Sequence, residues 1–425
     1  MHNGYIDSYY NATARGIRER PALQGELTAD VCVIGGGITG TSAALHLAQR
    51  GKKVVLLEAQ RVGWGASGRN GGHVSVGQRK DQPALEKLVG HETAGKLWDL
   101  GLEAVQLLKA LIAGHSIDCD LKSGVLYVAA KQREVSGLQQ ECEHLRQRYG
   151  HQSVRFIPRD ELLGMLGTNR YFAGMLDETA AHLHPLNYVL GLAAAGEAAG
   201  ATIYERSRVC AFEQGQTVVV RTKAGCVRAR DVVIACNGYV ESLSRRMAGQ
   251  IMPINNFILA TEPLPETEAR SIIRDDVAVQ DSLFVINYWK LSADNRLIFG
   301  GGENYSRRFP ADIRSFVRKY MLRVYPQLAE TRIDYAWGGT LAITMSRLPG
   351  FGRLADNVLY AQGYSGHGVP TATLGGKLLA EAVSGETQRF DLMAGLPTRR
   401  FPGGALLRWP ALVAGMSYYA LRDRL

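Results

Sequence analysis

The sequence predicts an α/β fold in which a parallel sheet flanked by helices is combined with an inserted α+β domain built on an antiparallel sheet. Residues 31–58 have the pattern of a strand, a glycine turn, a helix and a second strand. Residues 357–383 repeat the order of strand, glycine turn and helix. Residues 251–345 are instead rich in β-branched and aromatic residues, which is typical of an antiparallel sheet. Strands are predicted at 251–261, 284–291, 296–301 and 333–344, with one helix at 313–324.

The segment 31–58 has the glycine spacing of a Rossmann-like dinucleotide site. Gly35 permits the tight turn, Gly37 lets the backbone approach a pyrophosphate, and Gly40 lets the helix lie close to the sheet. The helix N-terminus adds free amides and a positive dipole, and the acid that ends the second strand can accept hydrogen bonds from ribose hydroxyls. The alternative is an ordinary strand-to-helix loop. The predicted contacts are Gly35, Gly37, Ile38, Thr39, Gly40 and Glu58.

The next segment, 59–73, holds five glycines in 15 residues and is therefore a poor helix and a poor strand. It begins where the second strand ends, which is the edge at which open α/β sheets bind ligands. Its amides and polar side chains can serve a pyrophosphate and the edge of a ring system. The alternative is a surface loop. The predicted contacts are Ala59, Arg61, Gly65, Ala66, Ser67, Arg69, Asn70 and Gly71.

The pattern E-A-x-x-x-G-x-G-A-S-G-R-N-G-G at 58–72 resembles the FAD-dependent amine and amino-acid oxidases of the D-amino-acid oxidase and sarcosine oxidase superfamily. Similar motifs recur at 117–120, 182–187, 293–297, 362–368, 401–404 and 421–425. The resemblance implies a glutathione-reductase-type FAD domain and an enzyme that oxidises amines. Some relatives tether flavin to a cysteine in the C-terminal half, but this chain has no cysteine after Cys236, so we expect non-covalent FAD.

The second glycine turn, at 362–368, differs from the first because Pro370 opens its helix and no acid follows. The resemblance implies that this turn lies against the flavin, where a helix N-terminus would stabilise negative charge on the reduced ring. The predicted contacts are Gly363, Ser365, Gly366, His367, Gly368 and Val369. The resemblance also implies that the buried strand at 231–236 returns beside the first strand, although it could be a plain core strand. This strand would bring Asn237 and Gly238 to the cofactor. The resemblance also implies a cofactor contact at Val209.

The resemblance divides the chain into a discontinuous FAD-binding domain at 28–85, 150–250 and 346–400, and a substrate domain at 86–149 and 251–345. Residues 401–425 are predicted to form a C-terminal helix docked on the protein. Its apolar stretch at 406–419 could alternatively face a membrane, although Arg408 and Pro410 interrupt it.

The candidate catalytic residues are His73, Tyr288 and His367. His73 follows the glycine-rich segment, and an imidazole with a reference pKa of about 6.5 could keep the incoming amine unprotonated. Tyr288, together with the predicted substrate-binding residues Trp289 and Trp337, lies on strands that the resemblance implies face the flavin. Each of these side chains could instead belong to the core or to a structural hydrogen bond.

Composition excludes several other classes of protein. The net charge is +9, yet the basic residues are scattered among 40 acids, so we expect no nucleic-acid partner. The sequence contains no run of about 18 apolar residues, so we expect no membrane span. The six cysteines form no CxxC pair and no metal-ligand cluster, and we expect reduced thiols in a cytoplasmic protein.

The resemblance implies hydride transfer from an amine to flavin, followed by hydrolysis of the imine, with O2 as the expected electron acceptor. Sarcosine-type relatives carry a lysine after the second glycine turn, where this chain has Val369 and Pro370. This difference favours a longer amine such as gamma-glutamylputrescine, and hence a role in polyamine catabolism. The alternatives are an N-substituted glycine such as sarcosine or iminodiacetate, and a D-amino acid. An electron-transferring dehydrogenase subunit and a non-catalytic flavoprotein also stay open.

Overall fold

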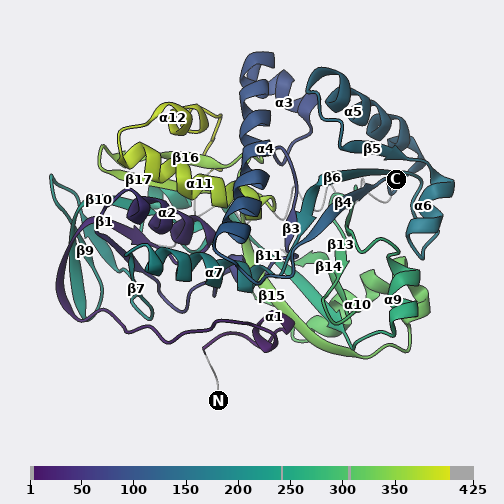
Figure 1. Ribbon diagram of the computed structural model, residues 1–425, viewed down its shortest axis with the longest axis horizontal. Helices are drawn as coiled ribbons and strands as arrows, with labels where there is room; N and C mark the ends of the chain where they lie inside the picture. The colour runs from purple at the N-terminus through teal and green to yellow at the C-terminus, as the bar shows by residue number, and fades with distance from the viewer. Residues whose placement is uncertain (1–3, 241–242, 305–307, 403–425) are drawn as a thin grey trace.

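The computed structural model describes residues 4–240, 243–304 and 308–402, which form two sheets with helices packed around them (Figure 1). The sheets lie side by side, and the long helix α4 (His91–Gly114) stands between them (Figure 1). The α/β fold with an antiparallel second sheet is therefore confirmed. The C-terminal helix predicted at 401–425, with its apolar stretch at 406–419, lies outside the described residues apart from Phe401 and Pro402.

The first sheet has the strand order β16-β17-β10-β1-β2-β7, in which the last five are parallel. Val31–Ile34 is a continuous buried run at its centre, as expected for a strand covered on both faces. The predicted return of the strand near 231–236 is confirmed, because Val233 is aligned with Val33 in a parallel pair. The strands are β1 (Gly25–Ile34), β2 (Val54–Leu57), β7 (Thr202–Tyr204), β10 (Gly225–Ile234), β16 (Gly350–Ala355) and β17 (Val358–Gln362), with β8 (Ala211–Glu213) and β9 (Val218–Arg221) attached to β10.

Helix α2 (Ile38–Gln49) is buried along almost its whole length, and its small residues let neighbouring elements approach closely. It packs against α11 (Gly368–Val383), where a Cβ on Gly376 would lie 2.6 Å from the Ala43 nitrogen. The Ser42 hydroxyl donates a hydrogen bond to the Thr373 carbonyl oxygen across the same contact (2.6 Å). The two helices that follow the two glycine turns are therefore held together. The other helices near this sheet are α7 (Pro185–Ala198), α8 (Arg245–Ala248) and α12 (Gln388–Ala394). Helix α1 (Tyr9–Ala12) instead contacts Tyr335 and Trp337 of the second sheet.

The second sheet has the order β15-β11-β14-β13-β12-β4-β6-β3, with β5 paired to β6. Its pairs are antiparallel apart from β4 and β12. Its strands are β3 (His73–Val74), β4 (Lys122–Val128), β5 (Val154–Ile157), β6 (Gly174–His182), β11 (Met252–Thr261), β12 (Ala278–Asp281), β13 (Tyr288–Leu291), β14 (Leu297–Asn304) and β15 (Ile333–Ile343). The helices around it and at its border are α3 (Gln82–Val89), α5 (Val135–Arg148), α6 (Arg159–Met165), α9 (Glu266–Ile272) and α10 (Ile313–Val324).

The structure differs from the sequence prediction in three places. Strands β5 and β6 belong to the second sheet, although 150–250 was predicted within the FAD-binding segments. The strand predicted at 231–236 begins earlier, at Gly225, because β10 pairs with β9 and β1 together. The strand predicted at 284–291 is shorter and begins at Tyr288.

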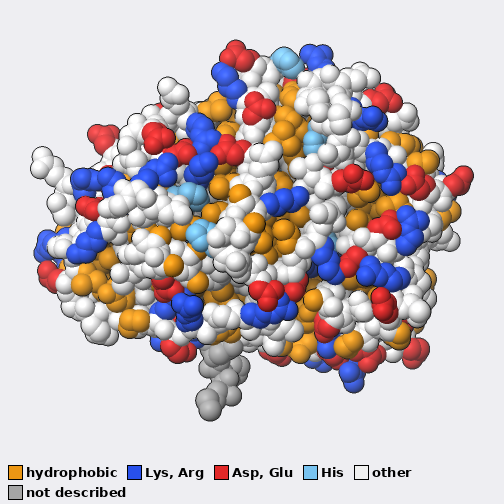
Figure 2. Space-filling view, in the orientation of Figure 1, with side chains coloured by type: hydrophobic (Ala, Val, Ile, Leu, Met, Phe, Trp, Pro, Cys, Tyr) orange, Lys and Arg blue, Asp and Glu red, His pale blue; other side chains and the backbone are white. Residues whose placement is uncertain are grey.

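No described helix has the length and apolar character required to cross a membrane. On the face shown in Figure 2, Lys and Arg side chains are interspersed with Asp and Glu. This surface carries no single extended block of one charge.

The contact between β1 and α2 yields the first prediction. A Cβ on Gly40 would collide with the carbonyl oxygen of Gly35, and the backbone would have to separate. We expect Gly40→Ala to lower the free energy of unfolding by about 1–3 kcal/mol or more, as overpacking does, and to lower flavin content. Thermal unfolding and the flavin absorbance of the purified protein measure both.

Gly95→Ala in α4 is the matched control, because a Cβ there meets no atom within 4 Å. Alanine is favoured over glycine inside a helix by about 0.5–1 kcal/mol, so this variant should be as stable as the wild type or more so. Equal stability and flavin content in the Gly40 variant would show that the close approach is dispensable.

Candidate active site

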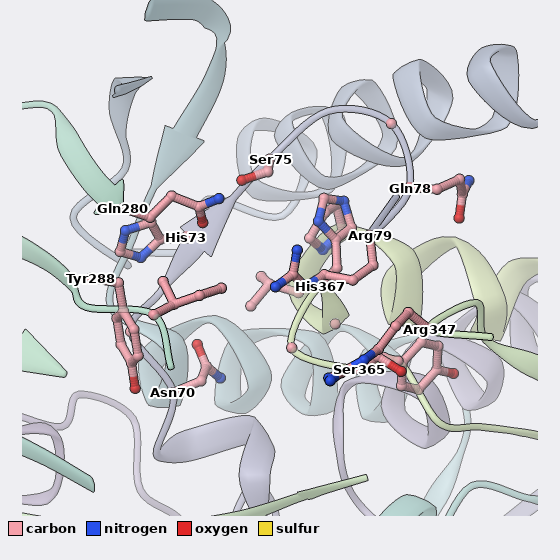
Figure 3. Close-up of a pocket in the computed structure, with 18 of the residues that line it drawn as sticks. Asn70, His73, Ser75, Gln78, Arg79, Gln280, Tyr288, Arg347, Ser365 and His367 are labelled. Atoms are coloured by element: carbon pink, nitrogen blue, oxygen red, sulfur yellow. The ribbon is translucent and has the colours of Figure 1, made fainter. Parts of the chain in front are cut away.

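A cavity of about 790 Å³ lies between the two sheets, and both sheets contribute to its walls. Figure 3 shows His73 and Tyr288 on one side of this space and Ser365 and Arg347 on another, with His367 between them. The cavity therefore joins both glycine turns to the second sheet. The predicted site residues that line it are Gly37, Ile38, Thr39, Ala66, Ser67, Arg69, Asn70, Gly71, His73, Asn237, Tyr288, Ser365, Gly366, His367, Gly368 and Val369.

The remaining predicted residues do not line this cavity: Gly35, Gly40, Glu58, Ala59, Arg61, Gly65, Val209, Gly238, Gly363, Trp289 and Trp337. Several of them shape its walls. Gly35 and Gly363 have positive φ values of 109° and 73°, which glycine adopts readily. The Gly363 amide donates a hydrogen bond to the Asn237 side-chain oxygen (2.8 Å), which ties the second glycine turn to the end of β10.

Glu58 lies beside the first glycine turn. Its carboxylate accepts hydrogen bonds from the amides of Gly36 (2.7 Å) and Gln60 (2.8 Å). Burial raises the pKa of the Glu58 carboxyl, and these two amides act in the opposite direction. A carboxylate fixed in this way at the end of β2 fits a ligand that offers ribose hydroxyls.

Ser67 stands at the N-terminus of α2. Its hydroxyl accepts a hydrogen bond from the Ile38 amide (3.0 Å), and a Cβ on Gly37 would lie 2.7 Å from the same oxygen. Only a residue without a side chain therefore leaves the helix N-terminus open to the cavity at this point. This arrangement fits a bound phosphate group.

Arg69 presents a donor that no described group satisfies. Its guanidinium lies over the Trp64 ring at 4.1 Å, and its Nε donates to the Trp64 carbonyl oxygen (2.6 Å). Its Nη2 has no hydrogen-bond acceptor among the described residues, and burial lowers the pKa of the side chain. A buried unsatisfied cation on a cavity wall fits an anionic or carbonyl-bearing ligand.

Asn70 uses its side chain to stabilise the glycine-rich segment itself. Its side-chain nitrogen donates to the carbonyl oxygens of Ala66 and Ser67 (3.0 Å each), and its side-chain oxygen accepts from the Gly72 amide (2.8 Å). These bonds hold the glycine-rich segment in one conformation.

Arg61 is a correction to the predicted cofactor contacts. Its side chain is 3% exposed and forms an ion pair with Glu205 (2.5 Å), which is fully buried. The sequence prediction failed because this acid lies far away in the chain. Val209 and Gly238 also lie away from the cavity, the first against the apolar core of the first sheet and the second near β15.

Trp289 and Trp337 are corrections to the predicted substrate contacts. Trp289 points into the core on the opposite face of β13 from Tyr288, where its Nε1 donates to the Tyr325 hydroxyl (2.9 Å). Trp337 is 2% exposed, and its Nε1 donates to the Arg69 carbonyl oxygen (3.0 Å). Trp337 therefore supports the cavity wall from behind rather than forming it.

His73 and His367 are neutral at neutral pH. Burial lowers the pKa of each to about 4. The Nε2 of His73 lies 3.1 Å from the Val279 carbonyl oxygen, and because a carbonyl only accepts, Nε2 carries the proton and Nδ1 is an acceptor. The expectation that His73 titrates near neutral pH is therefore wrong.

The His367 Nε2 has no hydrogen-bond partner among the described residues. Tyr288 packs edge-on against His73 at 5.7 Å, and its hydroxyl donates to the Asn256 side-chain oxygen (2.5 Å). The three candidate catalytic side chains thus share one cavity, and the two histidines are neutral.

The sequence analysis missed several polar residues that line the cavity: Ser75, Gln78, Arg79, Glu141, Gln280 and Arg347. They come from a loop after β3, from α5 and β12, and from the turn before β16. None belongs to a motif or follows a periodic pattern, so local sequence held no signal for them. Among the described residues, no group of three or more His, Cys, Asp or Glu side chains could hold a metal ion.

The comparisons with known proteins identify the family of the chain. The family model of the DAO family, described as FAD dependent oxidoreductase, matches residues 30–382. The chain belongs to this family of FAD-dependent oxidoreductases. The glycine turn, the Glu58 carboxylate and the Arg69 guanidinium are the residues that fit FAD.

Two relatives align over nearly the whole chain. The chain is 40% identical to gamma-glutamylputrescine oxidoreductase of Escherichia coli over 422 residues, which is 99% of each protein. It is 37% identical to the probable oxidoreductase OrdL of Haemophilus influenzae, over 99% of this chain and 98% of that protein.

Solved structures share the fold. Glycine oxidase from Geobacillus kaustophilus superimposes with a TM-score of 0.74 at 22% identity, over 89% of this chain and all of that chain. Iminodiacetate oxidase from Chelativorans gives a TM-score of 0.68 at 17% identity, over 84% and 95% of the two chains.

The position of Glu58 yields the second prediction. Glu58→Gln keeps the size of the side chain but removes its charge, so it should weaken FAD binding by about 1–3 kcal/mol, the value of a hydrogen bond to a charged group. Titration of flavin-free protein with FAD, followed by quenching of flavin fluorescence, measures the loss. Glu26→Gln on β1 is the control, because Glu26 is exposed and only faces Arg228 at 3.5 Å. Wild-type affinity in the Glu58 variant would exclude this carboxylate as the ribose ligand.

Proposed function

We propose that this chain is an oxidase that uses non-covalent FAD to oxidise the C–N bond of a long primary amine, with O2 as the electron acceptor and H2O2 as a product. The observation that carries the proposal is that one cavity joins the dinucleotide turn, the N-terminus of α11 and the His73–Tyr288 pair. None of the described cysteines lines this cavity, which supports non-covalent binding. We further propose that the enzyme acts in the cytoplasm on small molecules, without a nucleic-acid partner.

When bound, FAD supplies an acceptor for the hydride that leaves the carbon next to the amine nitrogen. The protein contributes orientation and electrostatics. Neutral His73 can accept a hydrogen bond through Nδ1, which favours an amine that keeps a proton to donate but carries no positive charge. Helix α11 begins at Gly368 on the cavity wall, so its N-terminal amides favour negative charge there. Loss of hydride from the neutral amine leaves an iminium ion, which water hydrolyses to an aldehyde and ammonium.

We propose gamma-glutamylputrescine, or a related polyamine conjugate, as the substrate. The 40% identity to a gamma-glutamylputrescine oxidoreductase over nearly the full length of both chains supports this choice. The turn after β17 also supports it, because Val369 and Pro370 line the cavity where a carboxylate of a short amino acid would need a cation. A carboxylate of the substrate would then bind far from the oxidised amine.

The third prediction concerns the substrate and the acceptor. In air, the purified protein should release H2O2 with gamma-glutamylputrescine at a kcat/KM at least tenfold above that with sarcosine, iminodiacetate or D-alanine, which is a difference of about 1.4 kcal/mol in transition-state binding. A peroxidase-coupled assay over this panel measures it. Faster turnover of sarcosine or D-alanine would contradict the substrate proposal. Anaerobic bleaching of the flavin without peroxide release in air would identify a dehydrogenase, and a flavin that no amine bleaches would identify a non-catalytic flavoprotein.

The fourth prediction concerns His73. His73→Asn should retain flavin but slow the anaerobic reduction of flavin by roughly 2- to 10-fold, the value of one hydrogen bond. Because burial keeps the pKa of His73 at about 4, the pH dependence of the reduction rate between about pH 6 and pH 9 should be unchanged. Stopped-flow absorbance measures both quantities.

His115→Asn, on an exposed residue after α4, serves as the control for this substitution. An unchanged reduction rate in the His73 variant would assign the side chain to structure. A changed pH profile would contradict its neutral state.

A further inference from the structure

We propose that the end of the cavity away from His73 and Tyr288 is a subsite for an α-amino-acid head group, in which Glu141 binds the ammonium and Arg79 binds the carboxylate. This inference rests on the proposed function and names the part of a gamma-glutamyl amide that each side chain recognises. In Figure 3, Gln78 lies on the opposite side of the cavity from His73, Tyr288 and Gln280, and Arg79 lies between them beside His367. The two ends of a long substrate would therefore meet different side chains.

Glu141 is a carboxylate without a partner in an apolar wall. It lies on α5 between Leu138 and Leu145, at the spacing of one helix face, and all three residues line the cavity. No described residue donates a hydrogen bond to its carboxylate or forms an ion pair with it. Burial and the nearby charge of Asp81 raise the pKa of the Glu141 carboxyl to about 7.

Glu141 is half-buried and has no compensating charge among the described residues, which disfavours its charged form, and a bound ammonium would supply the missing charge. Asp81 adds a second negative charge near the same place. One of its oxygens is already used, because it accepts a hydrogen bond from the Ala84 amide at the start of α3 (2.7 Å). Glu141 is thus the carboxylate that remains available for a ligand.

Two further buried polar atoms on residues of this end of the cavity have no partner among the described residues. They are the Nε1 donor of Trp98, which is 5% exposed, and the Oε1 acceptor of Gln78, which is 9% exposed. The other side-chain atom of Gln78, Nε2, donates to the Leu97 carbonyl oxygen (3.1 Å), which fixes the orientation of the amide. Buried polar groups are normally paired, so an unmatched donor and acceptor together indicate a site for a polar ligand.

Arg79 places a positive charge in the same region. Burial is the largest cause of the lowered pKa of His367, and the charge of Arg79 is the second. The same charge acts to lower the pKa of Tyr127, which lines the same cavity. The charges that line this part of the cavity therefore include a carboxylate and a guanidinium. This combination matches a zwitterion better than it matches a free diamine, which has no carboxylate.

The experiment compares four amides of putrescine that share the oxidised amine. The acyl groups are gamma-glutamyl, with ammonium and carboxylate; 4-aminobutanoyl, with ammonium alone; glutaryl, with carboxylate alone; and acetyl, with neither. In the wild type we expect kcat/KM to be highest for the gamma-glutamyl amide. We expect Glu141→Gln to raise KM about tenfold for the two amides that carry the ammonium, with little change in kcat, and to leave the other two unchanged.

Arg79→Gln should show the complementary pattern and raise KM for the two amides that carry the carboxylate. Glu143→Gln is the matched control, because Glu143 is an exposed acid on the same helix that does not line the cavity. Flavin content should be the same in all four proteins. Equal effects of Glu141→Gln on all four amides would overturn the assignment of Glu141.

A binding measurement separates this inference from the proposed function. Gamma-glutamyl-n-butylamide has the head group but no amine to oxidise, and calorimetry should show about tenfold weaker binding to the Glu141→Gln holoenzyme than to the wild type. If no amine reduces the flavin, the proposed function fails while this measurement still tests the subsite. If amines are oxidised but the wild type binds the butylamide no better than N-butylacetamide, the subsite is wrong and the proposed function stands.

Discussion

The close approach of α2 to the end of β1 is the constraint on which the site depends. Gly40 lies against the Gly35 carbonyl oxygen, and Gly376 of α11 lies against the backbone of α2 near Ala43. These contacts leave no room for side chains, so the two helices and the sheet are fixed relative to one another by backbone packing. As a result, the N-termini of α2 and α11 both open onto the cavity, and two sources of positive potential act on the same ligand.

The glycine-rich segment then carries the chain from the first sheet to the second. Its course is fixed at two carbonyl oxygens: the Arg69 oxygen accepts from Trp337 Nε1 (3.0 Å), and the Gly72 oxygen accepts from the Leu183 amide (2.9 Å). Directly after Gly72, β3 pairs with β6, so His73 enters the cavity from the edge of the second sheet. A single covalent segment therefore links the cofactor side to the candidate catalytic wall, and its bonds to both sheets hold the two sides in register.

The parts of the fold that sequence predicted are those with a complete local signal. The strand, turn and helix at 31–49 have a buried run, a spaced set of glycines and small helical residues, and α10 was predicted at 313–324 with the bounds that the structure shows. Side-chain direction was less predictable, because a strand of mixed aromatic residues does not reveal which face is the core. Tyr288 and Trp289 are neighbours of similar character, yet the first lines the cavity and the second is buried against Phe299.

Arg61 and Glu141 show why charged residues are harder still to assign from sequence. The sequence prediction chose Arg61 because it stands in the glycine-rich segment at 59–73. The structure pairs Arg61 with Glu205, and Arg20 bonds to the same acid (3.4 Å), so these buried charges compensate one another and serve the fold. The Glu141 carboxylate has no such compensation within the described residues. Because a charge withdrawn from water without a partner destabilises the folded protein, the position of the half-buried Glu141 on a cavity wall points to a ligand. The position of Arg61 in a network with Glu205 points to structure.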